Sequence, residues 1–114
     1  MHELSLMIAL AHMIANDAAT RGIGRITEVE IEVGELSGAF PHALREAFPL
    51  ATHGTIMDNA SLTIIEVPAM AQCQTCPSQF SPVARGWQCP TCEKNGCVLI
   101  SGTELGVRSY VGEE

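Results

Sequence analysis

Apolar and polar residues alternate along one stretch of the chain, Ile26-Thr27-Glu28-Val29-Glu30-Ile31-Glu32-Val33. Successive side chains of a β-strand point to opposite faces of its sheet. The apolar side chains at positions 29, 31 and 33 therefore share one face, and the three glutamates share the other. This pattern predicts a half-buried strand. The glutamate row is interpreted as its solvated face rather than as a cation site.

A helix is expected before this strand. Apolar residues recur at spacings of three and four between Leu4 and Ala18, and Gly22 and Gly24 follow as stop signals. The apolar arc of this helix is wider than packing on a single sheet requires. The excess predicts a second neighbour, either another helix or another subunit, so the sequence is compatible with a homodimer or a docked partner.

A second helix is expected after the strand. Pro41 suits the first position of a helix that continues through Phe48. Pro49 is expected to end or kink this helix, because a proline ring removes a backbone donor and clashes with the preceding turn. The pair His53-Gly54 is a further stop signal.

Two more strands complete the expected sheet. Residues 61–67 and 103–111 both show strand patterns. A two-stranded sheet is marginal by itself, so residues 103–111 are expected to return to the first sheet as its third strand. The predicted fold class is α+β, with two helices packed on a small three-stranded sheet.

The composition changes after Pro68. Residues 73–97 are rich in Cys, Pro, Gly, Gln and Thr and have almost no apolar periodicity, so a metal is expected to replace a core there. We therefore expect an α/β unit formed by residues 1–68 plus 102–114. A zinc-ribbon-like unit of residues 69–101, the cysteine module, is inserted before the last strand.

Four of the five cysteines form two Cys-x-x-Cys knuckles separated by twelve residues, and the four are Cys73, Cys76, Cys89 and Cys92. Two such knuckles are typical of one tetrahedral zinc ion held by four thiolates. A redox dithiol needs only one pair, and an iron–sulfur cluster is the other alternative. Ligand type and spacing favour zinc. Because the protein fills every position, the predicted zinc site is structural rather than catalytic. Cys97 is interpreted as a small buried hydrophobe.

The chain is acidic, with 13 Asp and Glu against 6 Lys and Arg among 114 residues and a formal net charge of −7. This balance disfavours binding to nucleic acid or to an anionic membrane surface. The apolar run at residues 4–14 does not fit a signal peptide, because Glu3 stands where a basic region is expected. We expect a cytoplasmic protein, whose thiols stay reduced.

The first two residues carry a set of nitrogen donors that can chelate a metal ion. The α-amine of Met1, the backbone nitrogen of His2 and the His2 imidazole can form two fused chelate rings with three nitrogen donors in a plane. Such donors suit square-planar Ni(II) or Cu(II). On the dipeptide alone, a solvated chain end is the simpler interpretation.

Taken together, five features resemble the HypA/HybF family of hydrogenase nickel-incorporation proteins over essentially the whole chain. They are Met1-His2-Glu3-Leu4-Ser5-Leu6, Val33-Gly34-Glu35-Leu36-Ser37, Ala43-Leu44-Arg45-Glu46-Ala47-Phe48, His53-Gly54-Thr55 and the paired knuckles. The combination of the Met-His-Glu start with two knuckles is specific, whereas neither half is diagnostic separately.

The resemblance implies a metallochaperone that takes up Ni(II) and, with a partner GTPase, helps to load it into the large subunit of nickel–iron hydrogenase. Some similar proteins also serve urease. Met1 and His2 match the family's nickel ligands, Glu3 is a nearby carboxylate that ligates or orients His2, and the four knuckle cysteines match its zinc ligands. One departure is His42, which occupies a position that is commonly acidic. It is a candidate further donor, and the simpler interpretation is a solvated histidine at the start of the helix.

Two other classes of function fit the sequence less well. A zinc-ribbon adaptor or nucleic-acid-binding regulator should have a basic surface, yet only Arg85 and Lys94 are basic in the cysteine module. A zinc hydrolase would need an open coordination position and a base, and the sequence has no nucleotide-binding Gly-Lys loop and no His-Glu-x-x-His. The chain is therefore not expected to be an enzyme.

Overall fold

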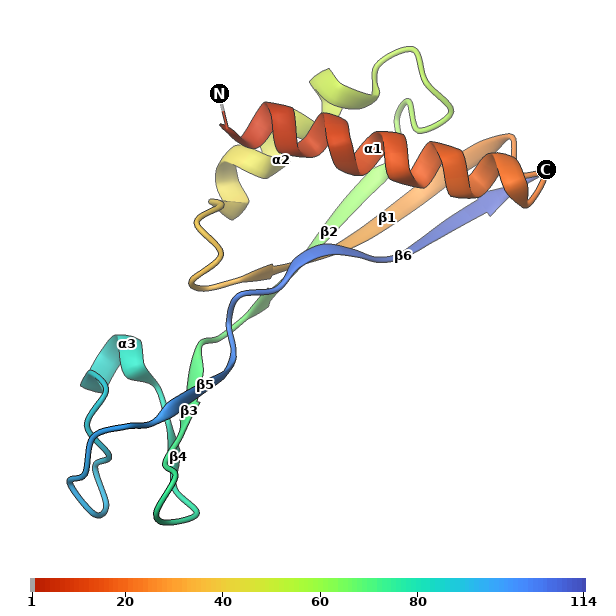
Figure 1. Ribbon diagram of the computed structural model, residues 1–114. Helices are drawn as coiled ribbons and strands as arrows, with labels where there is room; N and C mark the ends of the chain where they lie inside the picture. Colours follow the sequence, from red (N-terminus) through yellow and green to blue (C-terminus); the bar gives the residue numbers. More distant parts are fainter. Residues whose placement is uncertain (1) are drawn as a thin grey trace.

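The computed structural model of the protein describes residues 2–114, so Met1 lies outside the described residues. In chain order the elements are α1 (His2–Thr20), β1 (Arg25–Gly34), α2 (Pro41–Thr52), β2 (Ser61–Val67), β3 (Met70–Gln72), β4 (Gln79–Phe80), α3 (Pro82–Arg85), β5 (Val98–Ser101) and β6 (Leu105–Glu113). The molecule is elongated, with extents of 54 × 28 × 17 Å. One small sheet lies at each end of the molecule. The end that contains β1, β2 and β6 also contains α1 and α2 and is called the larger end below (Figure 1).

The larger sheet has the strand order β2-β1-β6. β1 and β2 are parallel and are connected through α2, and β1 and β6 are antiparallel. Parallel neighbours need such a crossover, whereas β6 reaches β1 only after the chain has passed through the cysteine module. The predictions of three strands, of a late returning strand and of an inserted module are confirmed.

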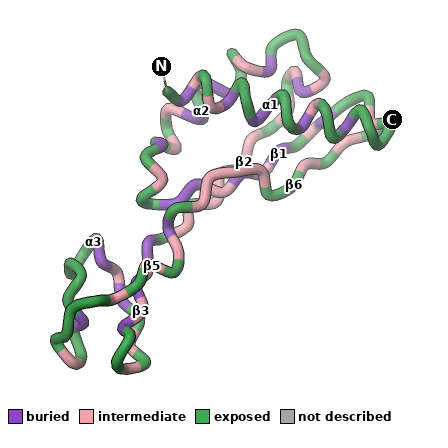
Figure 2. Tube along the Cα trace, in the orientation of Figure 1, coloured by how far each residue is buried: buried purple, intermediate pink, exposed green. Residues whose placement is uncertain are grey.

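The main core lies between this sheet and the two helices. The buried apolar residues of α1, β1 and α2 form one cluster, which includes Met7, Ile14, Ile31 and Leu44. Figure 2 shows the buried positions along the facing sides of these elements. The second neighbour expected for the first helix is thus at least in part α2, although Met13 remains 61% exposed.

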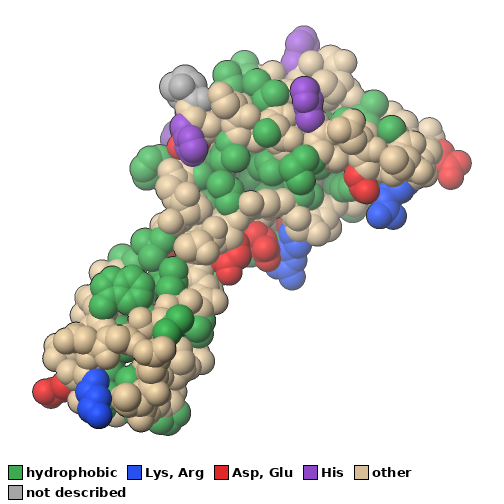
Figure 3. All heavy atoms as spheres, in the orientation of Figure 1, with side chains coloured by type: hydrophobic (Ala, Val, Ile, Leu, Met, Phe, Trp, Pro, Cys, Tyr) green, Lys and Arg blue, Asp and Glu red, His purple; other side chains and the backbone are tan. Residues whose placement is uncertain are grey.

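The opposite face of the sheet is open and carries the glutamates of β1. Arg108 of β6 lies beside two of them, with its Nε 3.5 Å from Glu30 Oε1 and its Nη1 3.9 Å from Glu32 Oε1. Figure 3 shows acidic and basic side chains next to one another along the lower side of the larger end. Ion pairs between such partly exposed groups stabilise a protein only weakly. The structure therefore agrees with the interpretation of the glutamate row as a solvated face.

The end of α2 lies at the predicted stop signal His53-Gly54, with His53 as the C-cap and Gly54 at a φ of +76°. The helix does not end at Pro49 but continues for three residues to Thr52. Pro49 cannot donate to the carbonyl of Arg45, yet both residues are exposed, so water can satisfy that carbonyl. The last turn is held by the Thr52 hydroxyl, which donates to the Phe48 carbonyl over 2.8 Å.

The cysteine module contains a second sheet that the sequence did not predict, with the order β4-β3-β5. Its strands are two to four residues long, too short for a periodic signal. A single helical turn, α3, follows β4 and is capped by Ser81, whose Oγ accepts from the Ala84 N–H. No helix formed by residues 2–114 is long and apolar enough to cross a lipid bilayer.

Candidate metal centres

The four knuckle cysteines come together at the tip of the cysteine module, and their sulfur atoms all lie within 4.8 Å of one another. Cys73 Sγ is 3.5 Å from Cys92 Sγ, and Cys76 Sγ is 3.6 Å from Cys89 Sγ. A tetrahedral zinc ion with Zn–S bonds of about 2.3 Å requires sulfurs about 3.8 Å apart. The four sulfurs, called the cysteine cluster below, therefore fit zinc, and each close pair takes one cysteine from each knuckle.

The two knuckles share one backbone hydrogen bond, from the first cysteine to the carbonyl five residues later. The Cys73 N–H donates to the Ser78 carbonyl and the Cys89 N–H donates to the Lys94 carbonyl, both over 3.0 Å. The side chain of Gln72 reinforces the first knuckle, because its Nε2 donates to the carbonyls of Cys73, Cys76 and Ser78 at 3.0 to 3.3 Å. The turns that aim the sulfurs are thus held by hydrogen bonds that do not involve the sulfurs.

Thr75 is a contributor to this site that the sequence analysis missed. Its Oγ1 lies 3.3 Å from Cys73 Sγ and 3.4 Å from Cys92 Sγ, so it bridges the two knuckles. The Thr75 hydroxyl and backbone N–H lower the pKa of Cys73 to about 5. The signal was present in the sequence, because both knuckles carry threonine at their third position.

The remaining cysteines of the cluster have contrasting acidities. The backbone N–H groups of Cys92 and Thr91 hold the pKa of Cys89 below its usual value. For Cys76, the Ser78 N–H acts in the same direction, but burial and the neighbouring cysteines raise the pKa to about 12. A zinc ion requires its cysteine ligands as thiolates, so metal binding to the cluster releases protons.

Cys97 packs against the cluster without belonging to it. Burial, followed by the charges of the cluster cysteines, raises the pKa of its thiol. A protonated, partly buried thiol matches the prediction of a small hydrophobe better than that of a fifth ligand.

The start of α1 lies at the other end of the molecule (Figure 1). His2 is exposed, whereas Glu3 is only 9% exposed. The carboxylate of Glu3 accepts from the backbone N–H of Phe40 over 3.4 Å, at the residue that precedes α2. Phe40 has no side-chain cap of its own, so Glu3 ties the start of α1 to the start of α2. Met1, the first predicted nickel ligand, lies outside the described residues.

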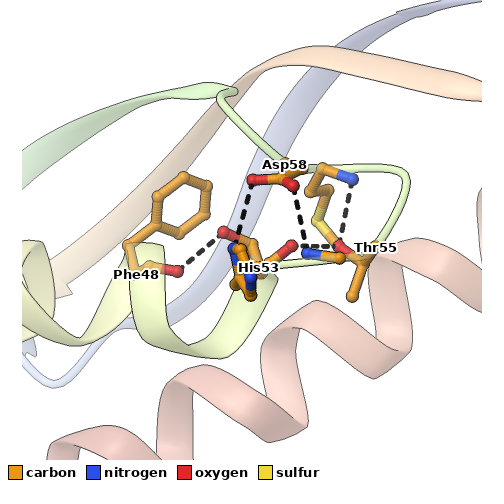
Figure 4. Close-up of polar contacts among 7 residues, drawn as sticks. Phe48, His53, Thr55 and Asp58 are labelled. Atoms are coloured by element: carbon orange, nitrogen blue, oxygen red, sulfur yellow. Dashed lines mark hydrogen bonds and ion pairs between the residues drawn. The ribbon is translucent and has the colours of Figure 1, made fainter.

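The other histidines show no metal-binding set within residues 2–114. His42 Nε2 lies 3.6 Å from Glu46 Oε2 on the exposed side of α2, and His12 is exposed on α1. His53 Nδ1 lies 3.9 Å from Asp58 Oδ1, and the other oxygen of Asp58 accepts from the Gly54 N–H at 3.1 Å (Figure 4). These two contacts of Asp58 close the loop of residues 53–58, which begins with the His53-Gly54 turn.

Removal of the Glu3 carboxylate is expected to destabilise the larger end. Glu3→Ala leaves the Phe40 N–H without its acceptor and should lower the free energy of unfolding by about 1 kcal/mol. Glu3→Gln keeps an acceptor oxygen and should lose less. Urea denaturation checks both variants, with Glu46→Ala as the control because Glu46 is exposed on α2. A loss for Glu3→Ala no larger than that control would contradict the role.

The fold and the cysteine cluster define a metal-binding protein in which a small α/β unit carries a zinc-ribbon-like module. Comparison with known proteins identifies the family. The model of the family described as HypA, hydrogenase/urease nickel incorporation, metallochaperone, matches residues 1–111, and the chain belongs to this family. The resemblance found in the sequence is thereby confirmed.

Individual relatives agree. A hydrogenase maturation factor HypA from Chlorobium limicola is 37% identical over 114 residues, which are 100% of this chain and 98% of that protein. One from Geotalea daltonii is 39% identical over 108 residues, covering 95% and 96%. Among solved structures, the Ni metallochaperone HypA from Helicobacter pylori matches with a TM-score of 0.68 at 19% identity, covering 97% of each chain. That last likeness shows the fold.

Proposed function

We propose that this chain carries Ni(II) at its N-terminus for the maturation of nickel–iron hydrogenase. The donors are the Met1 amine, the His2 backbone nitrogen and the His2 imidazole, and Glu3 is a carboxylate that ligates or orients His2. The cysteine cluster holds a structural zinc ion. Residues 1–68 plus 102–114 form the nickel-binding unit, and residues 69–101 form the zinc unit. The protein works in the cytoplasm and delivers nickel to the hydrogenase large subunit; delivery to urease is a second outlet.

The separation of two unlike donor sets is the observation that carries this proposal. An exposed histidine stands at the first turn of α1, and four sulfurs lie together at the far end of the molecule. Nitrogen donors suit Ni(II), whereas a closed set of four thiolates suits zinc. A few donors at a chain end can release their ion to a partner, and four thiolates with no vacancy do not.

Any energy from nucleotide hydrolysis must come from another protein. The sequence has no Gly-Lys loop that could bind nucleotide phosphates. A partner GTPase is therefore part of the proposal. Nucleic acid is not, because Arg85 and Lys94 remain the only basic residues of the cysteine module against a net charge of −7 for the chain.

Nickel titration of the untagged protein tests the site. Wild type should bind one Ni(II). His2→Ala and a form with extra residues before Met1 should each weaken binding by more than the roughly 10–100-fold that loss of an outer-shell partner costs a metal site. His12→Ala is the matched control, because it removes an exposed histidine from the same helix. Equal affinity of all four proteins would exclude the terminal site.

A further inference from the structure

The chain enters and leaves the cysteine module beside one short segment, residues 34–36, called the clamp segment. The Glu35 N–H donates to the Val67 carbonyl over 2.9 Å, on the entering side. The Leu36 N–H donates to the Gly102 carbonyl over 2.7 Å, and the Gly34 N–H donates to the Glu104 carbonyl over 2.6 Å, on the leaving side. The clamp segment is thus hydrogen-bonded to both connections at once.

Two carboxylates strengthen this arrangement. Glu35 Oε1 accepts from the Ala69 N–H over 2.8 Å, and Glu104 Oε1 accepts from the Gly102 N–H over 2.7 Å. Glu35 belongs to the larger end and Ala69 is the first residue of the module, whereas Glu104 and Gly102 both lie in the connection that leaves the module. Ala69 is fully buried, so its N–H depends on Glu35 for a partner. Hydrogen bonds to ionised groups are among the stronger ones in proteins.

The backbones in this junction approach one another without intervening side chains. A Cβ added to Gly102 would lie 2.5 Å from Ala69 Cα, and Gly102 adopts a φ of +113°. A Cβ added to Gly34 would meet the Gly102 carbonyl and would lie 2.7 Å from the Glu104 nitrogen. Because the backbones pack this closely, the segments that enter and leave the cysteine module have little space to move relative to each other.

The clamp segment also leads towards the start of α1. Residues 37–40 continue from it to α2, and Ala39 within them is buried in the main core. Phe40 donates its N–H to Glu3, the residue after His2. One loop therefore contacts the cysteine module at one end and the first turn of α1 at the other.

We propose that the clamp segment fixes the orientation of the cysteine module relative to the larger end of the molecule, and that Glu35 is its positioning residue. Among the side-chain contacts of this junction, the one made by Glu35 joins the larger end to a residue of the module, Ala69, and its removal leaves the close backbone packing in place. Loss of its carboxylate releases the Ala69 N–H at the entrance to β3. The module then reorients as a body while its own sheet and cysteine cluster stay intact.

Residual dipolar couplings of backbone amides in the full chain test this proposal without nickel, so the outcome is separate from that of the nickel titration. In wild type, couplings from β2-β1-β6 and from β4-β3-β5 should fit one alignment tensor. In Glu35→Ala they should require two, at unchanged zinc content. Glu35→Gln, which keeps an acceptor oxygen, should restore the single tensor.

Glu28→Ala serves as the control, because Glu28 is an exposed glutamate on β1, the strand that leads into the clamp segment. It should keep a single tensor. Two tensors in wild type, or one unchanged tensor in Glu35→Ala, would overturn the proposal. A loss of zinc or of dispersed module resonances in Glu35→Ala would also overturn it, because Glu35 would then support the module's fold rather than its orientation.

Discussion

Replacement of Cys89 by serine is expected to unfold residues 69–101 while β2-β1-β6 and its helices remain folded. The module has almost no core of its own, because its buried cluster consists of Ala71, Cys73, Phe80 and Cys89. So few apolar residues cannot offset the conformational entropy of ordering such a segment. A metal must supply the difference, as it does in small zinc domains that are unfolded without their ion.

Cys89 is the one of the four cysteines whose substitution is expected to disturb the zinc site most. Its side chain is fully buried, and its Sγ accepts from the N–H groups of Thr91 and Cys92 over 3.4 and 3.5 Å. A serine hydroxyl is neutral at pH 7 and is not a ligand of structural zinc sites. Bound zinc should therefore fall from one ion per chain to nearly none.

Metal analysis and an amide correlation spectrum measure this outcome. Resonances of residues 70–101 should collapse to the narrow range of a disordered chain, and those of α1 and β1 should stay dispersed. Cys97→Ser is the matched control, because it makes the same change in a cysteine that lies outside the cluster, and it should keep its zinc. Retention of zinc by Cys89→Ser would refute a four-thiolate site, and unfolding of the whole chain would refute a separable module.

The part of the fold that was predictable is the part with long periodic signals. The alternation in β1 set both its strand and its two faces, and Val33 is buried where Glu28 is exposed, as predicted. The stop signals after α1 were also informative. Gly22 adopts a φ of +71°, and the Ile23 N–H bonds back to the Ala18 carbonyl. Hydrophobic periodicity and the backbone preference of glycine depend on neighbouring residues in the chain, so they can be recognised in the sequence.

Local rules failed where solvent or tertiary contacts decide. Proline usually breaks a helix, but the carbonyl that Pro49 leaves without a donor belongs to an exposed residue, so α2 continues. The strands of the small sheet are set by pairing between distant residues, such as Ala71 with Phe80 and with Leu99, and have no periodicity to detect.

The candidate sites divide in the same way. The four cysteines were predictable, because ligand type and spacing are written in the chain and one ion needs all four sulfurs together. The partner of the Glu3 carboxylate was not, because the Phe40 N–H is 37 residues away and is brought there by the packing of α1 on α2. This contact adds a structural role for Glu3, and its role beside His2 stays a prediction.

Replacement of Gly34 by alanine is expected to be among the most damaging single changes to the larger end. Gly34 is buried at the end of β1, opposite Val67 of β2. An added Cβ would run into the Gly102 carbonyl and would lie 2.7 Å from the Glu104 nitrogen. Both obstacles are backbone, which cannot rotate aside as a flexible side chain can. We expect a loss of about 3 kcal/mol in the free energy of unfolding, at the upper end of overpacking costs.

Gly106→Ala provides the matched control for this loss. Gly106 also lies in a strand, pairs with Glu32 of the same β1, and has nothing within 4 Å of its added Cβ. Alanine there reduces the freedom of the unfolded chain without a clash, so stability should stay unchanged or rise by about 0.4–1 kcal/mol. Urea denaturation of both variants with zinc bound measures the difference.

The comparison separates steric fit from the general cost of losing a glycine. If both alanines cost the same, strand propensity would explain the loss and the close backbone approach at Gly34 would be irrelevant. If only Gly34→Ala is damaging, the contact of β1 with the chain leaving the cysteine module is a constraint on stability. The hydrogen bond from the Gly34 N–H to the Glu104 carbonyl must then break or lengthen when the added Cβ pushes the two segments apart. In that case the contact of Gly34 with residues 102–104 stabilises both β1 and the segment that leaves the module, and a residue with a side chain at position 34 could not make this contact.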